Sequence, residues 1–494
     1  MQEFNTRVAL GRLATGFVAL ALWLPLVTAV APAAFVNPED TPLTARDGTA
    51  FMVTRGRVRV PELHMAPDGA AIELAVVRIR RAGTAAAGRV HVLLAGGPGD
   101  SGVRQALDLA RQGGAALAEF IDGDLVGIDQ RGAGGSIPNL RATARYGLPL
   151  DQPASVAAWL PLAERAARTV AAEMRGRGIR LEAYNTEESA VDVDAVRESL
   201  GYERMTLWGR SYGTHLALAV ARRHPDRVER MVLVSPEGPD HTWKLPSQVD
   251  RVLQRIGERA GAPGMAGQLR TVVDKLAQAP VPVEVRDPAT GRDARVVIGA
   301  MDLQWAIAQA IGDPRAIATL PAAVQEMSAG DFQRVAPLIL MLRRQLGIDS
   351  AMKHMMDLSS GASAARMARI EREAGSALLG DAMNFPARHL YAAWNARPLE
   401  DAFREPVTVA VPTLLLVGDL DARTPLENAQ EIAAALPQAQ LVVVENAAHQ
   451  FDVFGNAAIR TLLGRFVRGE AGLGSRIALP PLRFEGAGPL RVAQ

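Results

Sequence analysis

The sequence predicts an α/β protein: a mostly parallel sheet covered by helices, with a large helical insertion late in the chain. Apolar strand-like runs alternate with helical stretches, and most of these runs are apolar on both faces, which is typical of parallel strands between two helical layers. The alternation stops between residues 236 and 405, where helical stretches rich in Ala, Leu, Met and Arg dominate. The expected strands are residues 51–60, 72–79, 90–95, 125–129, 205–209, 231–234, 413–417 and 441–444.

These runs predict an eight-stranded sheet. The first two are separated by the turn signal Ala66-Pro67-Asp68-Gly69, so we expect them to form an antiparallel pair. Residues 137–185 predict a helical excursion, and residues 187–200 a helix that ends at Gly201. Within the insertion, only residues 283–298 are strand-like.

The insertion divides the predicted core into residues 37–235 and 406–470. Because it follows the sixth strand, near the expected site edge of the sheet, residues 236–405 are interpreted as a lid, with a purely structural second domain as the alternative. Residues 471–494 predict an extended tail.

The amino terminus resembles an export signal. Arg7 and Arg12 precede the apolar run 13–30, and small residues follow as far as Ala34. A positive flank, an apolar middle and a small-residue exit are the three parts of a secretory signal. Residues 1–36 therefore predict a signal peptide cleaved near Ala33 and a periplasmic or secreted protein; an uncleaved membrane anchor through residues 13–30 is the alternative.

Composition excludes several classes of function. The 494 residues include 54 Lys and Arg against 53 Asp and Glu, a net charge of +1, so no nucleic-acid partner is expected. The chain has no cysteine, which excludes disulfides, thiolate metal sites and a cysteine nucleophile. The chemistry predicted below requires neither a metal nor a cofactor.

The strongest candidate for chemistry is Ser211 in Gly209-Arg210-Ser211-Tyr212-Gly213. This Gly-x-Ser-x-Gly pattern follows a predicted strand and opens a helical pattern, as in a nucleophile elbow, where glycines let strand and helix approach each other. Such a turn would expose Ser211 at the carboxyl edge of the sheet. An ordinary glycine-containing turn is the alternative interpretation.

Two later strands end in residues that would complete a triad. Asp421 follows the strand at 413–417, and His449 follows the strand at 441–444. Nucleophile, acid and histidine in this chain order are typical of such sheets. Asp419 is the alternative acid. Thr424, Pro425 and Glu427 predict a helix start in which Thr424 is the N-cap of a capping box.

An acyl-transfer site also needs backbone donors for the oxyanion. The loop Gly96-Gly97-Pro98-Gly99 follows the strand at 90–95, and the N–H of Gly97 with that of Tyr212 would form the oxyanion hole. A phosphate-binding loop is the alternative, although no lysine follows it. Residues 129–136 are interpreted as structural support for the neighbouring loops.

Together these motifs resemble the α/β-hydrolase serine peptidases of the prolyl-aminopeptidase and tripeptidyl-aminopeptidase branch. The resemblance rests on Gly-Gly-Pro-Gly at 96–99, Asp-Gln-Arg-Gly-x-Gly-x-Ser at 129–136 and Gly-x-Ser-Tyr-Gly-Thr at 209–214, with Asp421 and His449. It implies the α/β-hydrolase fold and removal of amino-terminal residues from peptides, with lid acids that bind the substrate amine. Ala95 stands where the family commonly has histidine. Glu326, Asp357 and Asp381 are acidic residues of the lid region, but they match no pattern that identifies an amine-binding acid.

The sequence thus predicts an exported serine hydrolase with Ser211, His449 and Asp421 as its catalytic triad. Its expected substrate is a small peptide cleaved by aminopeptidase action. A carboxylesterase acting on small esters is the first alternative, because the same triad serves both reactions. A non-catalytic envelope binding protein is the second.

Overall fold

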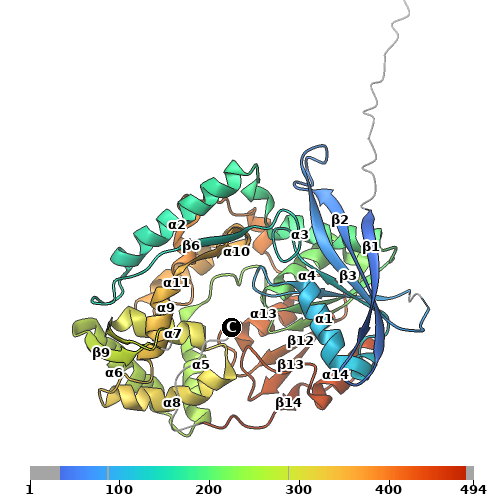
Figure 1. Cartoon of the computed structure of the whole chain (residues 1–494). Helices are drawn as coiled ribbons and strands as arrows, with labels where there is room; N and C mark the ends of the chain where they lie inside the picture. The colour runs from blue at the N-terminus through green and yellow to red at the C-terminus, as the bar shows by residue number, and fades with distance from the viewer. Residues whose placement is uncertain (1–33, 86–87, 288, 485–494) are drawn as a thin grey trace, which may run out of the picture. The chain divides into compact units, whose positions relative to one another are not determined.

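The computed structural model describes residues 34–85, 88–287 and 289–484, which form a ten-stranded main sheet. The strand order is β1-β2-β3-β5-β4-β7-β8-β12-β13-β14 (Figure 1). The strands are β1 (Phe35–Thr44), β2 (Ala50–Pro61), β3 (Ala71–Arg81), β4 (Val90–Leu94), β5 (Asp124–Ile128), β7 (Met205–Arg210), β8 (Val228–Val234), β12 (Thr413–Gly418), β13 (Ala439–Glu445) and β14 (Arg476–Ala478).

The sheet is antiparallel from β1 to β5 and parallel from β5 to β14. All eight expected strands are present, and β2 and β3 form the expected antiparallel pair. The count of eight was wrong because it missed both edges. β1 contains Pro38 and Pro42 and is largely exposed, so it lacks an apolar pattern, and β14 has only three residues.

Helices cover both faces of the sheet. Successive strand residues point to opposite sides: Leu207 of β7 packs with α3 (Thr186–Ser199), α4 (Tyr212–Arg223) and α13 (Leu426–Ala435), whereas Trp208 packs with α1 (Gly102–Gly113) and α14 (Ala457–Val467). The carboxyl ends of the parallel strands therefore lie between two helical layers.

The segment between β8 and β12 is mostly helical and has its own apolar core. The short strands β9 (Val281–Arg286) and β10 (Asp293–Ile298) pair as a hairpin, which confirms the strand-like patch. The helices are α5 (Pro246–Arg259), α6 (Met265–Gln278), α7 (Ala300–Ala310), α8 (Pro314–Ser328), α9 (Ala336–Arg344), α10 (Ala351–Ser360), α11 (Ala364–Ala374) and α12 (Tyr391–Trp394).

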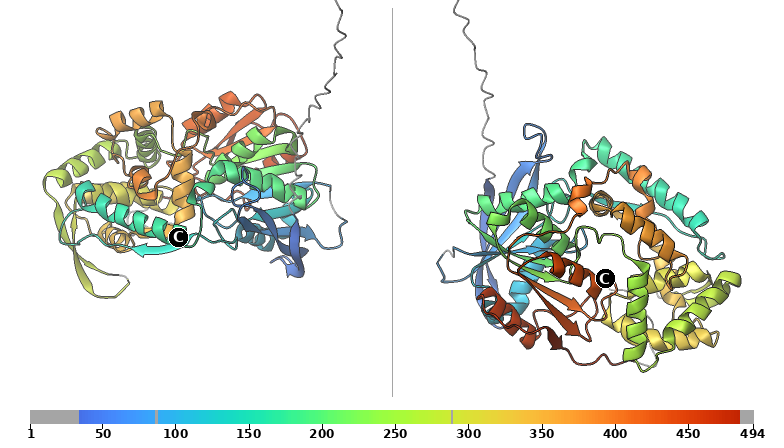
Figure 2. Two further views of the ribbon diagram at one scale, coloured as in Figure 1. Left: turned by 90° about the horizontal axis from the view of Figure 1, so that it is seen from above. Right: turned by 180° about the vertical axis from the view of Figure 1, so that it is seen from behind.

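The excursion after β5 joins this insertion. The predicted helical excursion is present as the long helix α2 (Val156–Gly176), and a short strand that was not predicted, β6 (Arg141–Arg145), precedes it. β6 pairs with β11 (Gly347–Ser350) of the insertion, and α2 lies beside the insertion in both views of Figure 2. Two segments far apart in the sequence therefore build one cap.

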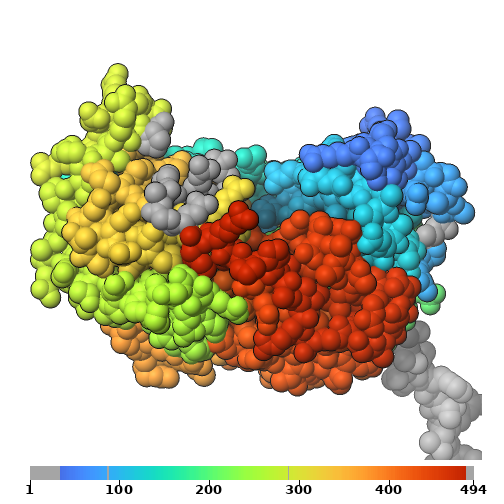
Figure 3. All heavy atoms as spheres, turned by 90° about the horizontal axis from the view of Figure 1, so that it is seen from below, coloured from blue at the N-terminus to red at the C-terminus, as the bar shows by residue number. Residues whose placement is uncertain are grey.

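The carboxyl-terminal part of the chain contacts both the sheet and the insertion. β14 pairs with β13, and Leu482 and Phe484 pack against the core of the insertion. Figure 3 shows the orange and red residues of this part side by side with the yellow and green insertion. The predicted tail is therefore anchored as far as residue 484.

The predicted signal segment lies mostly outside the described residues, which begin at residue 34. Among the helices that the structure describes, none is long and apolar enough to cross a membrane.

Candidate active site

Ser211 occupies a strained turn between β7 and α4. Its φ of 52° and ψ of −127° lie outside the regions that non-glycine residues favour. The turn is held at both ends, because the Ser211 N–H donates to Val234 O at 3.0 Å and the Thr214 hydroxyl donates to Ser211 O at 2.6 Å. Strand and helix thus fix the serine at the carboxyl edge of the sheet.

Close backbone contacts explain the glycines around Ser211. A Cβ at Gly209 would lie 2.6 Å from Gly213 O, and one at Gly213 would lie 2.1 Å from Leu94 O. A Cβ at Gly96 would lie 3.0 Å from Arg210 O. The Gly-x-Ser-x-Gly spacing is therefore a packing requirement of this turn.

Asp421 and His449 meet after β12 and β13, two neighbouring parallel strands. His449 Nδ1 lies 2.9 Å from Asp421 Oδ2, and the Asp421 side chain is fully buried. Burial raises the pKa of Asp421, but the charge of His449 and the hydrogen bonds from His449 and Thr424 outweigh it, so its pKa is lowered. Asp421 is therefore a buried carboxylate directed at the imidazole.

The capping box predicted at Thr424 was wrong. Helix α13 begins at Leu426, and its N-cap is Pro425, which has no side-chain cap bond. The Thr424 hydroxyl instead donates to Asp421 Oδ2 at 2.8 Å, and the Thr424 N–H donates to Asp421 Oδ1 at 2.8 Å. Thr424 thus orients the aspartate that faces His449.

Asp419, the alternative acid, has a different partner. Its Oδ2 accepts from Arg259 Nη2 of α5 at 2.7 Å. Burial raises the pKa of Asp419, and the Arg259 charge opposes this. The carboxylate that contacts His449 is therefore Asp421.

Gly97 lines the same cavity as Ser211, and Tyr212 follows Ser211 in the chain; their role as the oxyanion hole stays a prediction. Gly97 has a φ of +111°, and the neighbouring Gly96 approaches Ser211 Cβ. The Tyr212 N–H belongs to the first turn of α4, where backbone donors have no partner within the helix.

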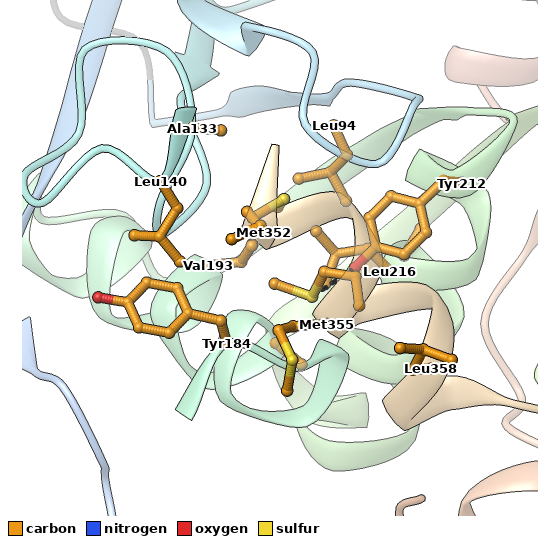
Figure 4. Close-up of a cluster of buried hydrophobic side chains, with 14 of the residues drawn as sticks. Leu94, Ala133, Leu140, Tyr184, Val193, Tyr212, Leu216, Met352, Met355 and Leu358 are labelled. Carbon is orange, nitrogen blue, oxygen red and sulfur yellow. Dashed lines mark hydrogen bonds between the residues drawn. The ribbon is translucent and has the colours of Figure 1, made fainter. Parts of the chain in front are cut away.

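The Tyr212 side chain is buried away from this edge. Its hydroxyl contacts Thr186 Oγ1 at 3.1 Å and Met356 Sδ of α10 at 3.3 Å. Figure 4 shows Tyr212 and Leu216 of α4 among the methionines of α10, which joins the cap to the helix that follows Ser211.

Ser211 and His449 open into one cavity of about 1050 Å³. Gly96 and Gly97 also line it, so the predicted nucleophile, base and oxyanion loop share one space. Its volume is at the upper end of the range for small-molecule sites, which leaves room for several residues of peptide. Among the described residues, no hydrogen bond joins Ser211 Oγ to His449.

Sequence reasoning missed the charged residues that line this cavity, which are Arg46, Asp100, Asp108, Arg210, Asp313, Arg423 and Asp452. Arg210 and Arg423 line it beside Ser211 and His449, and the exposed Asp100 and Asp452 lie on its wall. The sequence does place Arg210 next to the predicted nucleophile and Arg423 two residues after Asp421, which could have marked both as candidates for the site. Whether their side chains reach the cavity depends on how the loops fold.

Glu326, Asp357 and Asp381 do not line this cavity, whereas Asp313 of the same insertion does. Glu326 pairs with Arg334, Asp381 with Arg388, and Asp357 with Lys353. In the parts of the chain that the structure describes, no group of three or more His, Asp or Glu side chains is placed to hold a metal ion.

Residues 129–136 brace the site from behind, as expected. Asp129 Oδ1 accepts from Ser101 Oγ at 2.6 Å and from Val103 N–H at 3.0 Å, which fixes the start of α1 after the glycine loop. Arg131 is completely buried and binds Asp192 of α3 through Nε at 2.8 Å and Nη2 at 2.7 Å. This motif therefore couples the glycine loop to the helical layer.

Comparison with known proteins places this geometry in a fold family. A family model described as the alpha/beta hydrolase fold matches residues 92–273, and one described as TAP-like protein matches residues 384–470. The strand order and the elbow agree with the first match. The chain is an α/β hydrolase by fold.

The curated relatives confirm the resemblance to the peptidase branch. The chain is 31% identical over 196 residues to the tripeptidyl aminopeptidase of Streptomyces lividans, an alignment covering 38% of this chain and 36% of the relative. It is 29% identical over 192 residues to the serine protease Hip1 of Mycobacterium bovis, covering 37% and 36%. The chain thus aligns with about a third of the length of these relatives.

Solved structures align at lower identity. An esterase from Thermogutta terrifontis is 17% identical, with a TM-score of 0.32 over 84% of this chain and 93% of its own. An epoxide hydrolase from an endophytic Streptomyces is 17% identical, with a TM-score of 0.36 over 89% and 98%. The assignment of the fold rests on the family match and the strand order.

Proposed function

We propose that this chain is a serine hydrolase that removes amino-terminal residues from short peptides. The observation that carries the proposal is the Asp421–His449 pair, hydrogen-bonded at 2.9 Å, which opens into the same cavity as the strained Ser211. The resemblance to tripeptidyl aminopeptidases supports peptides as the substrate class.

In the proposed mechanism, Ser211 attacks the scissile carbonyl and His449 accepts its proton. His449 then returns this proton to the leaving amine, and Asp421 orients and stabilises the imidazolium. The N–H groups of Gly97 and Tyr212 stabilise the oxyanion, each by roughly 3–4 kcal/mol in comparable sites. Water then attacks the acyl-enzyme. His449 accepts a proton from this water and returns it to Ser211 Oγ as the acyl group leaves.

The test compares an alanyl amide with a free amine, its amino-blocked form and a short-chain ester, using wild type and Ser211→Ala. Aminopeptidase action predicts turnover of the free-amine amide and little of the blocked one. Ser211→Ala should abolish turnover and labelling by a fluorophosphonate. A wild-type chain that is neither labelled nor active would instead support the non-catalytic alternative.

One observation favours an esterase as the second candidate. Glu326, Asp357 and Asp381 each pair with a cation and none lines the cavity, so these three acids are not placed to bind the substrate amine. Asp313 of the insertion does line the cavity, but its carboxylate caps α8. If the ester is the better substrate and blocking the amine makes no difference, the esterase proposal replaces the aminopeptidase one.

Export remains a proposal based on residues 1–36. The expected result is a mature chain that begins near residue 34, measured by intact mass after expression in a host with a secretion pathway. Recovery of the uncleaved chain in the membrane fraction would favour the anchor.

A further inference from the structure

Arg210 and Arg423 line the cavity that contains Ser211 and His449, as does Arg46. Arg210 immediately precedes Ser211, and its Nη2 donates to His449 O at 3.2 Å. Arg423 follows Asp421 by two residues, and its Nη2 donates to Ala308 O at 3.2 Å and to Gln309 O at 2.9 Å.

Neither arginine forms an ion pair with a carboxylate of the described residues. Arg210 and Arg423 are half-buried. Among the buried arginines that the structure describes, Arg131 and Arg343 each bind a buried aspartate, Asp192 and Asp302 respectively, whereas the Arg366 guanidinium group bonds only to a backbone carbonyl. Buried cations are normally paired, since an unpaired charge loses its hydration without compensation. Burial lowers the pKa of Arg210 and of Arg423, which is the expected consequence of that loss.

No acidic residue that lines the cavity forms an ion pair with Arg210 or Arg423 within the described residues, although the charges of Asp452 and Asp100 act on Arg210 from beyond ion-pair distance. Asp313 is the N-cap of α8 and accepts from Arg315 N–H at 2.8 Å. Asp452 is exposed and accepts from Gly455 N–H at 2.7 Å. Asp421 interacts electrostatically with both arginines, but its carboxylate oxygens are bound to His449, Thr424 and the loop backbone. The guanidinium groups are therefore available to a ligand.

We propose that Arg210 and Arg423 bind a carboxylate of the substrate, namely the free carboxyl end of a short peptide. This inference rests on the proposed function. His449 must return its proton to the leaving amine, and Arg210 is bonded to the backbone of His449. In this arrangement the leaving half of the peptide would lie beside Arg210, where its terminal carboxylate suits a planar guanidinium donor.

The site would select peptides by length. A peptide whose carboxyl end lies within the cavity gains charge-assisted hydrogen bonds, whereas a long peptide carries no charge at that position. We therefore expect the chain to process short products of other peptidases in preference to intact proteins.

The experiment measures release of the amino-terminal residue from trialanine, from trialanine amide and from the amide of Ala-Ala-Glu. For wild type, replacing the carboxylate by the amide should raise KM by about tenfold or more, because a hydrogen bond to a charged group contributes about 1.5–3 kcal/mol. A KM for the amide of Ala-Ala-Glu close to that for trialanine would also support the carboxylate site, because it would show that a side-chain carboxylate reaches the site.

The variants Arg210→Gln and Arg423→Gln should lose this preference for the acid over the amide, and Arg210→Lys should retain part of it. Arg222→Gln is the matched control. Burial also lowers the pKa of Arg222, and its guanidinium group donates to backbone carbonyls, including Phe403 O at 2.6 Å. Unlike Arg210 and Arg423, Arg222 does not line the cavity. The control should keep the wild-type preference, and thermal denaturation should show all variants folded.

Failure of this inference can be distinguished from failure of the proposed function. Equal kcat/KM for trialanine and its amide in the wild-type chain, or an unchanged preference in both glutamine variants, would overturn the carboxylate site while peptide hydrolysis remained. Absence of residue release from every peptide, together with absence of fluorophosphonate labelling, would overturn the proposed function itself.

Discussion

At position 213, the first turn of α4 touches the end of β4 so closely that no side chain fits. A Cβ at Gly213 would lie 2.1 Å from Leu94 O. This oxygen belongs to the backbone of β4, which cannot move independently of the sheet. Gly213→Ala should therefore destabilise the fold by about 1–3 kcal/mol or more, the range for overpacking. Thermal denaturation measures the change.

The control is Gly267→Ala in α6. No atom lies within 4 Å of a Cβ at Gly267, and the residue is inside a helix, so alanine should be neutral or stabilising there. Equal melting temperatures for the two variants would contradict the packing argument.

Asp421 and Asp419 are two residues apart and should differ sharply in their effect on activity. Asp421→Asn would leave the imidazole without its carboxylate, and comparable triads lose about 10⁴-fold in kcat. Asp419→Asn removes only the partner of Arg259, so kcat should stay close to wild type. Steady-state hydrolysis of the best substrate measures both. A larger loss of kcat in Asp419→Asn than in Asp421→Asn would identify Asp419 as the acid of the triad instead.

At the scale of the elements, Asp122 lies between α1 and β5 and should make stability depend on acid pH. The His91 hydrogen bond, with that of Arg89, lowers the pKa of Asp122 to about 2 despite partial burial. Because the folded pKa is lower than the ordinary value of 3.8, the stabilisation is complete above about pH 4 and is lost as the pH falls toward 2.

Asp122→Asn should therefore lower stability at neutral pH and flatten its pH dependence between about 4 and 2. Urea denaturation at a series of pH values measures this slope. His91→Gln removes the same hydrogen bond and should flatten the curve as well. An unchanged slope in Asp122→Asn would exclude this carboxylate as the source.

Arg131 connects three elements through one guanidinium group. It binds Asp192 of α3 bidentately and donates to Glu62 O after β2 at 2.6 Å. Arg131→Ala would leave Asp192 buried and unpaired, which costs about 3–5 kcal/mol in comparable pairs. Denaturant titration measures the loss, and the exposed Arg104 of α1 provides a control expected to change stability by less than about 0.5 kcal/mol.

At the scale of the whole molecule, Trp159 joins the excursion after β5 to the insertion. Its ring lies 4.6 Å from that of Trp305 and 5.2 Å from that of Phe385, both edge-on, and its side chain is almost fully buried. Trp159→Ala should destabilise the fold by about 3–5 kcal/mol, and Trp159→Phe by less. If the cap unfolds together with the sheet, the denaturation midpoint falls without a second transition. A separate early transition would show that the cap unfolds on its own.

The parts of the site that could be predicted are those that local sequence encodes. Ser211 was identified because glycines at 209 and 213 satisfy a contact between adjacent elements, and His449 and Asp421 because each follows an apolar strand. Thr424 was misassigned because its hydroxyl could bond either the helix start or Asp421, and only the folded loop selects between them.

The sequence by itself determined the fold class, the eight inner strands and the position of the helical insertion, because hydrophobic periodicity and glycine spacing act within a few residues. Only the tertiary structure decided the pairing of β6 with β11, the edge strands β1 and β14, and the cavity in which Arg423 and His449 meet Ser211. These contacts join residues far apart in the chain, so their energies depend on which surfaces meet in the folded protein, and no local pattern records them.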